Sequence, residues 1–206
     1  MPAPFVHLNH LDLLHISRKL WKKRLASRSL QDLEAEILKI PRDENEVPGW
    51  LIPEIYFDYQ RTGDPSRLLG VMYHNRMDIL SLAALMIYIG DALRLMDPLS
   101  STIHPTDLYS MGVIYNDVGL DDQAESIFLA CRKIDGLDEL YLPDLLQRLG
   151  LIYKRRADWV RAVEAWEAAI KLRDINAALE LAKYYEHQES DYPRALFWTQ
   201  TASSFV

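Results

Sequence analysis

The sequence lacks the marks of several common protein classes. It contains one cysteine, Cys131, so it forms no disulfide within the chain and offers no cysteine-based zinc site. No stretch reaches about 18 consecutive apolar residues, and the first residues have neither the basic nor the apolar region of a signal peptide. We therefore expect a cytoplasmic protein with no membrane partner.

The chain also lacks the basic excess that is typical of nucleic-acid-binding proteins. Its 23 Lys and Arg residues are outnumbered by 30 Asp and Glu residues, which gives a net charge of −7. The acidic excess lies in the second half, because the first 100 residues carry 12 basic and 13 acidic side chains. With 49% hydrophobic residues, the 206-residue chain has enough apolar side chains for one globular body or two small ones.

The second half contains a repeated pattern of small and aromatic residues. A Gly is followed by a Tyr, then an Ala and an aromatic residue at matched offsets, and a looser copy starts near Ala182. Small residues let two helices cross closely, while aromatic side chains fill the space beside the crossing. The pattern resembles the tetratricopeptide repeat (TPR) family, which implies about three helix hairpins. Its positions are Gly112, Tyr115, Ala124, Phe128, Gly150, Tyr153, Ala162, Trp166 and Ala169.

The TPR resemblance implies a concave surface that binds a protein or peptide ligand. The family's clamp for a peptide carboxylate uses Lys, Arg and Asn side chains on the inner helices, and Asn116, Lys154 and Lys183 are candidates by position. The segment "GLDELYLPD" at 136–144 accounts for the longer spacing between the first two repeats. The alternative interpretation is a set of ordinary amphipathic helices.

The stretch "LLGVMYHNRMDILSLAAL" at 68–85 has two interpretations. Its L-G-x-x-Y matches the start of a TPR helix, while His74 and Asp78 form an H-x-x-x-D pair. No break follows the tyrosine, and the apolar residues beyond it predict one long buried helix over about 74–96. The match to the repeat is then coincidental, and His74 and Asp78 share one face of that helix.

The sequence around this pair carries a second resemblance. The segments "HLDLLHISRKLWKKRLASRSLQDLEAEIL" and "VPGWLIPEIYFDYQRTGDPSRLLGVMYHNRMDILSLAAL" resemble the C-terminal part of ribonuclease-H-like DEDD exonucleases of the YprB type, over about residues 5–90. The resemblance implies that Asp78 is a metal-ligand carboxylate. It also implies that His74 orients or deprotonates the attacking water.

The same family needs further carboxylates for its two divalent ions, Mg²⁺ or Mn²⁺. They come from a D-x-E motif and an N-G-x-x-F-D-like motif that this chain does not contain, and Asp12 lies beyond the place of the second motif. The resemblance thus implies a shortened gene or a fragment with an incomplete exonuclease site and no tightly bound metal. The alternative is a non-catalytic TPR-like scaffold for protein–protein interaction.

Other candidate sites have weaker signals. A basic cluster around Trp21 suits the phosphates of a nucleic acid, although the acidic residues that follow it also favour a solvated helix face. Its members are Arg18, Lys19, Lys22, Lys23, Arg24 and Arg28. A metal site at His7, His10 and His15 is disfavoured, because no carboxylates stand at a matching spacing. Trp50 is predicted to pack in the turn before a helix.

The sequence as a whole predicts a nearly all-α protein. Residues 1–100 are assigned to truncated ribonuclease-H-like helices, and residues 101–206 to an α-solenoid of about three TPR-like hairpins. Helices are expected at about 11–25, 29–39, 50–62 and 74–96, with five or six more from about 106. At most one strand is expected, near Phe5–Leu11, and its unpaired backbone would have no partner within the chain.

Overall fold

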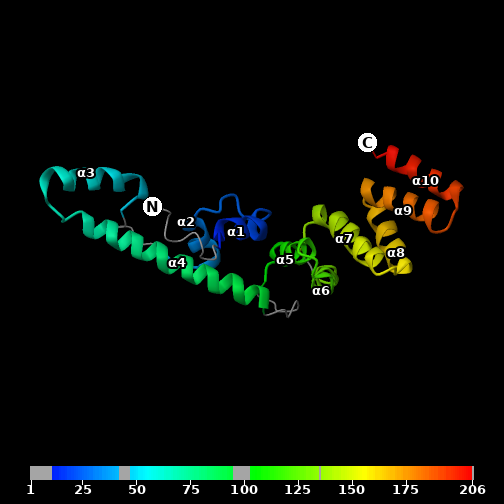
Figure 1. Cartoon of the computed structure of the whole chain (residues 1–206), viewed down its shortest axis with the longest axis horizontal. Helices are drawn as coiled ribbons and strands as arrows, with labels where there is room; N and C mark the ends of the chain where they lie inside the picture. The colour runs from blue at the N-terminus through cyan, green and yellow to red at the C-terminus, as the bar shows by residue number, and fades with distance from the viewer. Residues whose placement is uncertain (1–10, 42–46, 95–102, 135, 206) are drawn as a thin grey trace, which may run out of the picture. The chain divides into compact units, whose positions relative to one another are not determined.

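The computed structural model describes residues 11–41, 47–94, 103–134 and 136–205 (Figure 1). Every regular element in these ranges is a helix, so the prediction of an all-α fold is confirmed. The chain divides into two compact units, Met1–Met96 and Asp97–Val206. The predicted domain boundary at residue 100 lies outside the described residues. So does the predicted strand, except for Leu11, which belongs to no strand.

The first unit consists of short helices and one long one. In chain order they are α1 (Leu13–Trp21), α2 (Leu30–Leu33), the π-helical turn η1 (Glu34–Leu38), the 3₁₀ turn η2 (Gly49–Leu51), α3 (Ile52–Thr62) and α4 (Leu68–Arg94). Asp12 caps helix α1, because its Oδ1 accepts a hydrogen bond from the Leu14 N–H at 2.9 Å. The helix ends at Trp21, before the predicted residue 25. Beyond its end, the Arg28 guanidinium donates hydrogen bonds to the backbone carbonyls of Leu25 and Ala26.

Helix α4 runs unbroken for 27 residues. It begins at Leu68, earlier than the predicted residue 74, and its predicted end at 96 lies outside the described residues. Gly70 is therefore inside the helix. A methyl group placed there would lie 2.6 Å from Cγ2 of Val47, so the glycine allows the segment before η2 to pack closely on α4.

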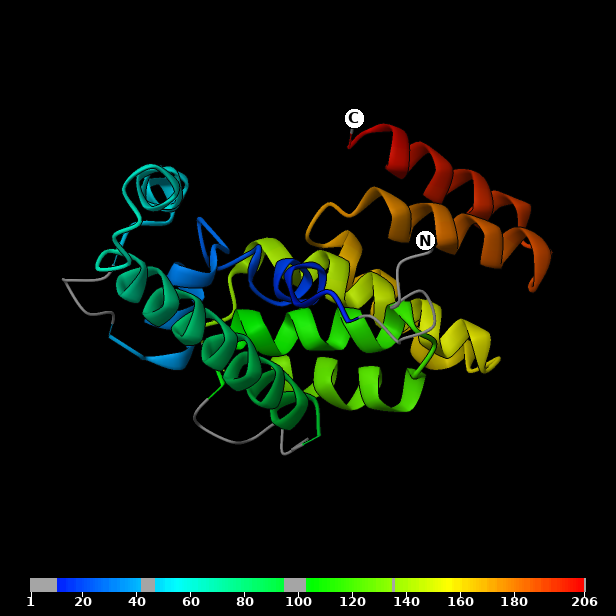
Figure 2. The ribbon, with the colours of Figure 1, turned by 60° about the vertical axis from the view of Figure 1, so that its left-hand side comes forward.

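The second unit consists of three helix hairpins. Figures 1 and 2 show the two helices of each hairpin side by side. The pairs are α5 (Pro105–Asp117) with α6 (Asp121–Cys131), α7 (Leu142–Arg155) with α8 (Trp159–Ile170), and α9 (Ile175–His187) with α10 (Tyr192–Ser203). The segment 136–144 contains a 3₁₀ turn, η3 (Glu139–Tyr141), which lengthens the connection between the first two hairpins.

The first two hairpins are built around the same contact between a glycine and an aromatic ring. A methyl group on Gly112 would lie 2.6 Å from Cε1 of Phe128, and one on Gly150 would lie 2.2 Å from Nε1 of Trp166. Only glycine permits so close an approach. The five positions that the repeat pattern predicts between the helices have no exposed surface, while Tyr153 is buried and Tyr115 half-buried. These five are Ala124, Phe128, Ala162, Trp166 and Ala169.

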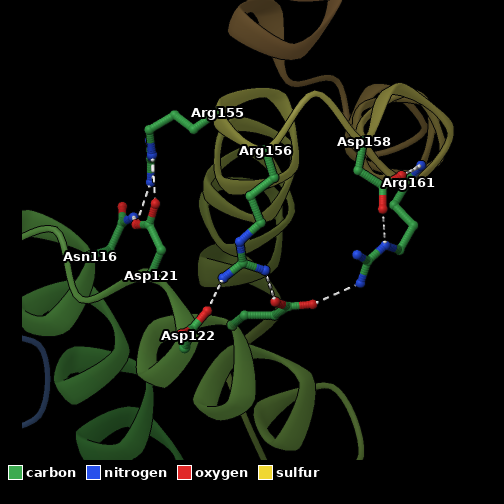
Figure 3. A network of polar contacts seen from close by, with 8 residues as sticks. Asn116, Asp121, Asp122, Arg155, Arg156, Asp158 and Arg161 are labelled. Carbon is green, nitrogen blue, oxygen red and sulfur yellow. Dashed lines mark hydrogen bonds and ion pairs between the residues drawn. The ribbon is translucent and has the colours of Figure 1, made fainter.

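Arginine side chains connect the first hairpin to the second (Figure 3). Arg155 binds both carboxylate oxygens of Asp121, with Nε–Oδ2 and Nη2–Oδ1 distances of 2.7 and 2.6 Å. This hydrogen bonding from Arg155 lowers the pKa of Asp121 below its usual value. Arg156 and Arg161 both bind Glu125. Arg155 ends α7, Arg156 follows it and Arg161 lies in the first turn of α8, while the carboxylates lie on α6. The network therefore fixes the neighbouring hairpins to each other.

Replacement of Gly150 by Leu tests the close crossing directly. The new side chain would overlap the Trp166 indole, so we expect Gly150→Leu to lower the free energy of unfolding by about 1–3 kcal/mol. Urea denaturation measures the loss. Gly90→Leu is the matched control, because nothing lies within 4 Å of a methyl group there. Equal stability of Gly150→Leu and the wild type would contradict the packing at this crossing.

Candidate functional site

His74 and Asp78 lie together on one face of α4. His74 Nε2 is 3.3 Å from Asp78 Oδ2, and the two side chains keep 14% and 32% of their surface exposed. The spacing of four residues on a helix produces this contact. Gly49, at the start of η2, lies against the imidazole, since a methyl group on it would be 3.9 Å from His74 Nε2. The pair is therefore positioned by α4 and η2 and remains accessible from solvent.

Trp50 follows Gly49 in η2, but its side chain is not packed. Its side chain is 79% exposed, so the prediction of a packed turn is wrong. The physical reason is that the 3₁₀ turn places Gly49, not Trp50, against α4. An exposed indole is a surface on which an unpaired nucleobase stacks. Trp50 is thus a candidate contact residue that its Pro-Gly-Trp context concealed.

The aromatic residue of the basic cluster, Trp21, is not available for the expected contact with nucleic acid. Trp21 is only 2% exposed, and its ring lies 6.3 Å from that of Tyr88 within the core of the first unit. It cannot stack on a base. Arg24 and Arg28 are half-buried, whereas the remaining cations are exposed. The exposed members, Arg18, Lys19, Lys22 and Lys23, can act on phosphates by charge alone.

The described residues do not by themselves form a site for two divalent cations. Among them there is no group of three or more His, Cys, Asp or Glu side chains placed to hold a metal ion. Asp78 is the one carboxylate within ion-pair distance of His74 in the described part of the chain. His15 is exposed, and His7 and His10 lie outside the described residues. A two-metal centre needs several carboxylates.

Helix α4 is apolar on the side away from its own core. Ser81, Leu85 and Ile89 are buried against the rest of the first unit. Exposed apolar side chains follow the opposite side of the helix at helical spacing, and we call this row the α4 stripe. It consists of Leu69, Met72, Ile79, Leu80, Met86 and Ile87, each between 51% and 74% exposed.

The second unit has a polar cavity of about 360 Å³ along the first helices of its three hairpins, here called the inner groove. It is lined by Asn116, Asp144, Gln147, Arg148, Leu151, Asn176, Leu179, Glu180 and Lys183. Two of the three clamp candidates, Asn116 and Lys183, therefore line it. Lys154 does not, and it binds Glu180 together with Lys183.

Gln147 is the unusual side chain of the inner groove. It is 9% exposed, and its Oε1 has no hydrogen-bond partner in the described structure. A buried acceptor without a donor costs free energy, so such an atom marks a place where a ligand donor would be favourable. No repeat motif pointed to Gln147, because the pattern of small and aromatic residues reports packing and not groove chemistry.

Comparison with known proteins gives a match for most of the first unit. Residues 1–90 are similar to the RNase_H superfamily. Divalent cations generally serve that superfamily. The chain is also 32% identical, over 194 residues, to the uncharacterized protein YprB of Bacillus subtilis (strain 168). The match covers 91% of this chain and 45% of that relative, so the chain spans less than half of the relative's length.

Helices of membrane-spanning length and hydropathy are absent from the described residues.

Proposed function

We propose that α4 contributes His74 and Asp78 to a metal-dependent site for phosphodiester hydrolysis, of the 3′-5′ exonuclease kind. The observation that carries the proposal is the 3.3 Å contact of these two side chains within a segment that matches the RNase_H superfamily. The remaining carboxylates would come from polypeptide beyond the described residues.

The two side chains have complementary roles in this proposal. The Asp78 carboxylate holds the imidazole of His74 in a fixed orientation, as carboxylates do for histidines at many metal sites. The accessible imidazole then orients a water molecule or accepts its proton, which histidine performs well near neutral pH. Bound divalent cations would stabilise the charge on the transferred phosphate. Trp50 and the exposed basic side chains would hold single-stranded nucleic acid by stacking and charge.

The proposal predicts that the chain alone hydrolyses neither DNA nor RNA. Asp78 by itself binds Mg²⁺ or Mn²⁺ only weakly, because Mg²⁺ is usually held by carboxylates together with substrate phosphates. Each 1.36 kcal/mol of lost transition-state stabilisation lowers the rate about tenfold. The test is incubation of the purified chain with labelled single-stranded DNA and RNA and either metal.

Asp78→Ala is the control for this assay, and it separates activity of the chain from that of a contaminant. We expect the same background with both proteins. Digestion by the wild type that disappears in Asp78→Ala would contradict the prediction. It would mean that this chain, or a pair of its copies, supplies the missing carboxylates itself.

We propose, as a second function, that the three hairpins form a TPR-like solenoid that binds a protein or peptide. The observation that favours it is the inner groove, with the unpartnered acceptor of Gln147 among amide and charged side chains. A peptide backbone N–H is a donor of the required kind. If this were the whole function, the first unit would be a non-catalytic part of the scaffold. A cytoplasmic location remains our expectation from the single, buried cysteine.

Panning a random-peptide phage library against the chain tests the groove. We expect enriched peptides whose binding falls about tenfold in Gln147→Leu, which removes the acceptor but keeps an apolar side chain of similar length. Gln200→Leu, an exposed substitution on α10, is the matched control. The interaction function would be abandoned if no peptide were enriched, or if every enriched peptide bound Gln147→Leu as well as the wild type.

A further inference from the structure

A second cavity lies within the first unit, between α1, α2 and α4. Its volume is about 310 Å³, and six leucines form most of its wall: Leu13, Leu14, Leu30, Leu33, Leu82 and Leu85. We call it the leucine pocket. Leu33 and Leu85 are buried, whereas Leu14 and Leu82 are each 42% exposed and so lie at the open side. Since an apolar cavity of about 150 Å³ holds a benzene molecule, the leucine pocket accommodates an alkyl chain of several carbons.

Three polar residues also line the leucine pocket. The Ser29 hydroxyl donates to Asp32, whereas Ser17 and Arg28 have unused hydrogen-bonding capacity. Ser17 has no exposed surface, and its hydroxyl has no hydrogen-bond partner in the described structure. The Nε of Arg28 is likewise buried and without a partner. Both groups are donors, so a ligand between them must present acceptor atoms.

The arrangement of Arg28 indicates an anionic acceptor. Its Nη1 donates to the backbone carbonyls of Leu25 and Ala26, at 3.0 and 2.8 Å, which holds the guanidinium in place. The partners of its side chain among the described residues are these two carbonyls and no carboxylate. A partly buried guanidinium is always charged, and buried charges are normally paired. The carboxylate group is the acceptor that best fits a guanidinium.

We propose that the leucine pocket binds a short aliphatic monocarboxylate. The carboxylate accepts hydrogen bonds from Arg28 Nε and the Ser17 hydroxyl, and the alkyl chain lies among the leucines. This site does not use His74 or Asp78 and is independent of the proposed hydrolysis. The ligand would join α1 and α2 to α4, and its binding would stabilise the unit by an amount that rises with the logarithm of its concentration.

Isothermal titration of the full chain with octanoate tests the proposal. We expect saturable binding that weakens roughly fourfold for each methylene removed on going to hexanoate. Octan-1-ol, which has the same chain but no charge, should bind at least about tenfold more weakly than octanoate. Absence of saturable octanoate binding to the wild type would overturn the proposal.

Two variants with matched controls locate the binding. Leu82→Trp fills the open side of the pocket and should abolish octanoate binding, whereas Leu80→Trp, on the α4 stripe, should leave it unchanged. Arg28→Gln should weaken octanoate at least about tenfold without affecting octan-1-ol, while the exposed Arg18→Gln should change neither. Equal octanoate affinities of the wild type, Leu82→Trp and Arg28→Gln would overturn the assignment even if binding were observed.

Discussion

Helix α4 carries apolar side chains on two opposite sides, and this arrangement distinguishes the first unit. One side packs through Leu85 and Ile89 on the short helices of the unit, and the other carries the α4 stripe. Large apolar patches on a protein surface mark interaction sites. The same helix holds His74 against Asp78, and their spacing places them on the face that also carries the buried Ser81 and Leu85.

The second unit is organised by a different physical rule. Its first two hairpins depend on glycine at the points where helices cross an aromatic ring, and on arginine–carboxylate bonds from the first hairpin to the second. The close crossing has a cost, because the Nε1 of Trp166 is buried without a hydrogen-bond partner. The dense packing of the indole on Gly150 offsets it. The three hairpins thus pack through their own residues, in contrast to the two-sided helix of the first unit.

Periodic features of the sequence predicted much of this structure. The offsets after Gly112 and Gly150 gave the hairpins, and the spacing of His74 and Asp78 gave their contact, because both follow from the turn of an α-helix. The burial of Trp21 could also have been predicted from the sequence, since Ser17, Leu20 and Trp21 fall on one helical face. The exposure of Trp50 and the leucine pocket could not be predicted, because they depend on how separate helices pack. The pattern of residues within one helix does not report that packing.

The central claim is that His74 and Asp78 belong to an incomplete metal site. Paramagnetic broadening of amide NMR signals by Mn²⁺ tests it directly, since broadening reports where the ion sits and needs no substrate. The account predicts weak binding, with broadening centred on α4 around His74 and Asp78, and its loss in Asp78→Asn. Broadening spread over the acidic surface, or unchanged in Asp78→Asn, would contradict it.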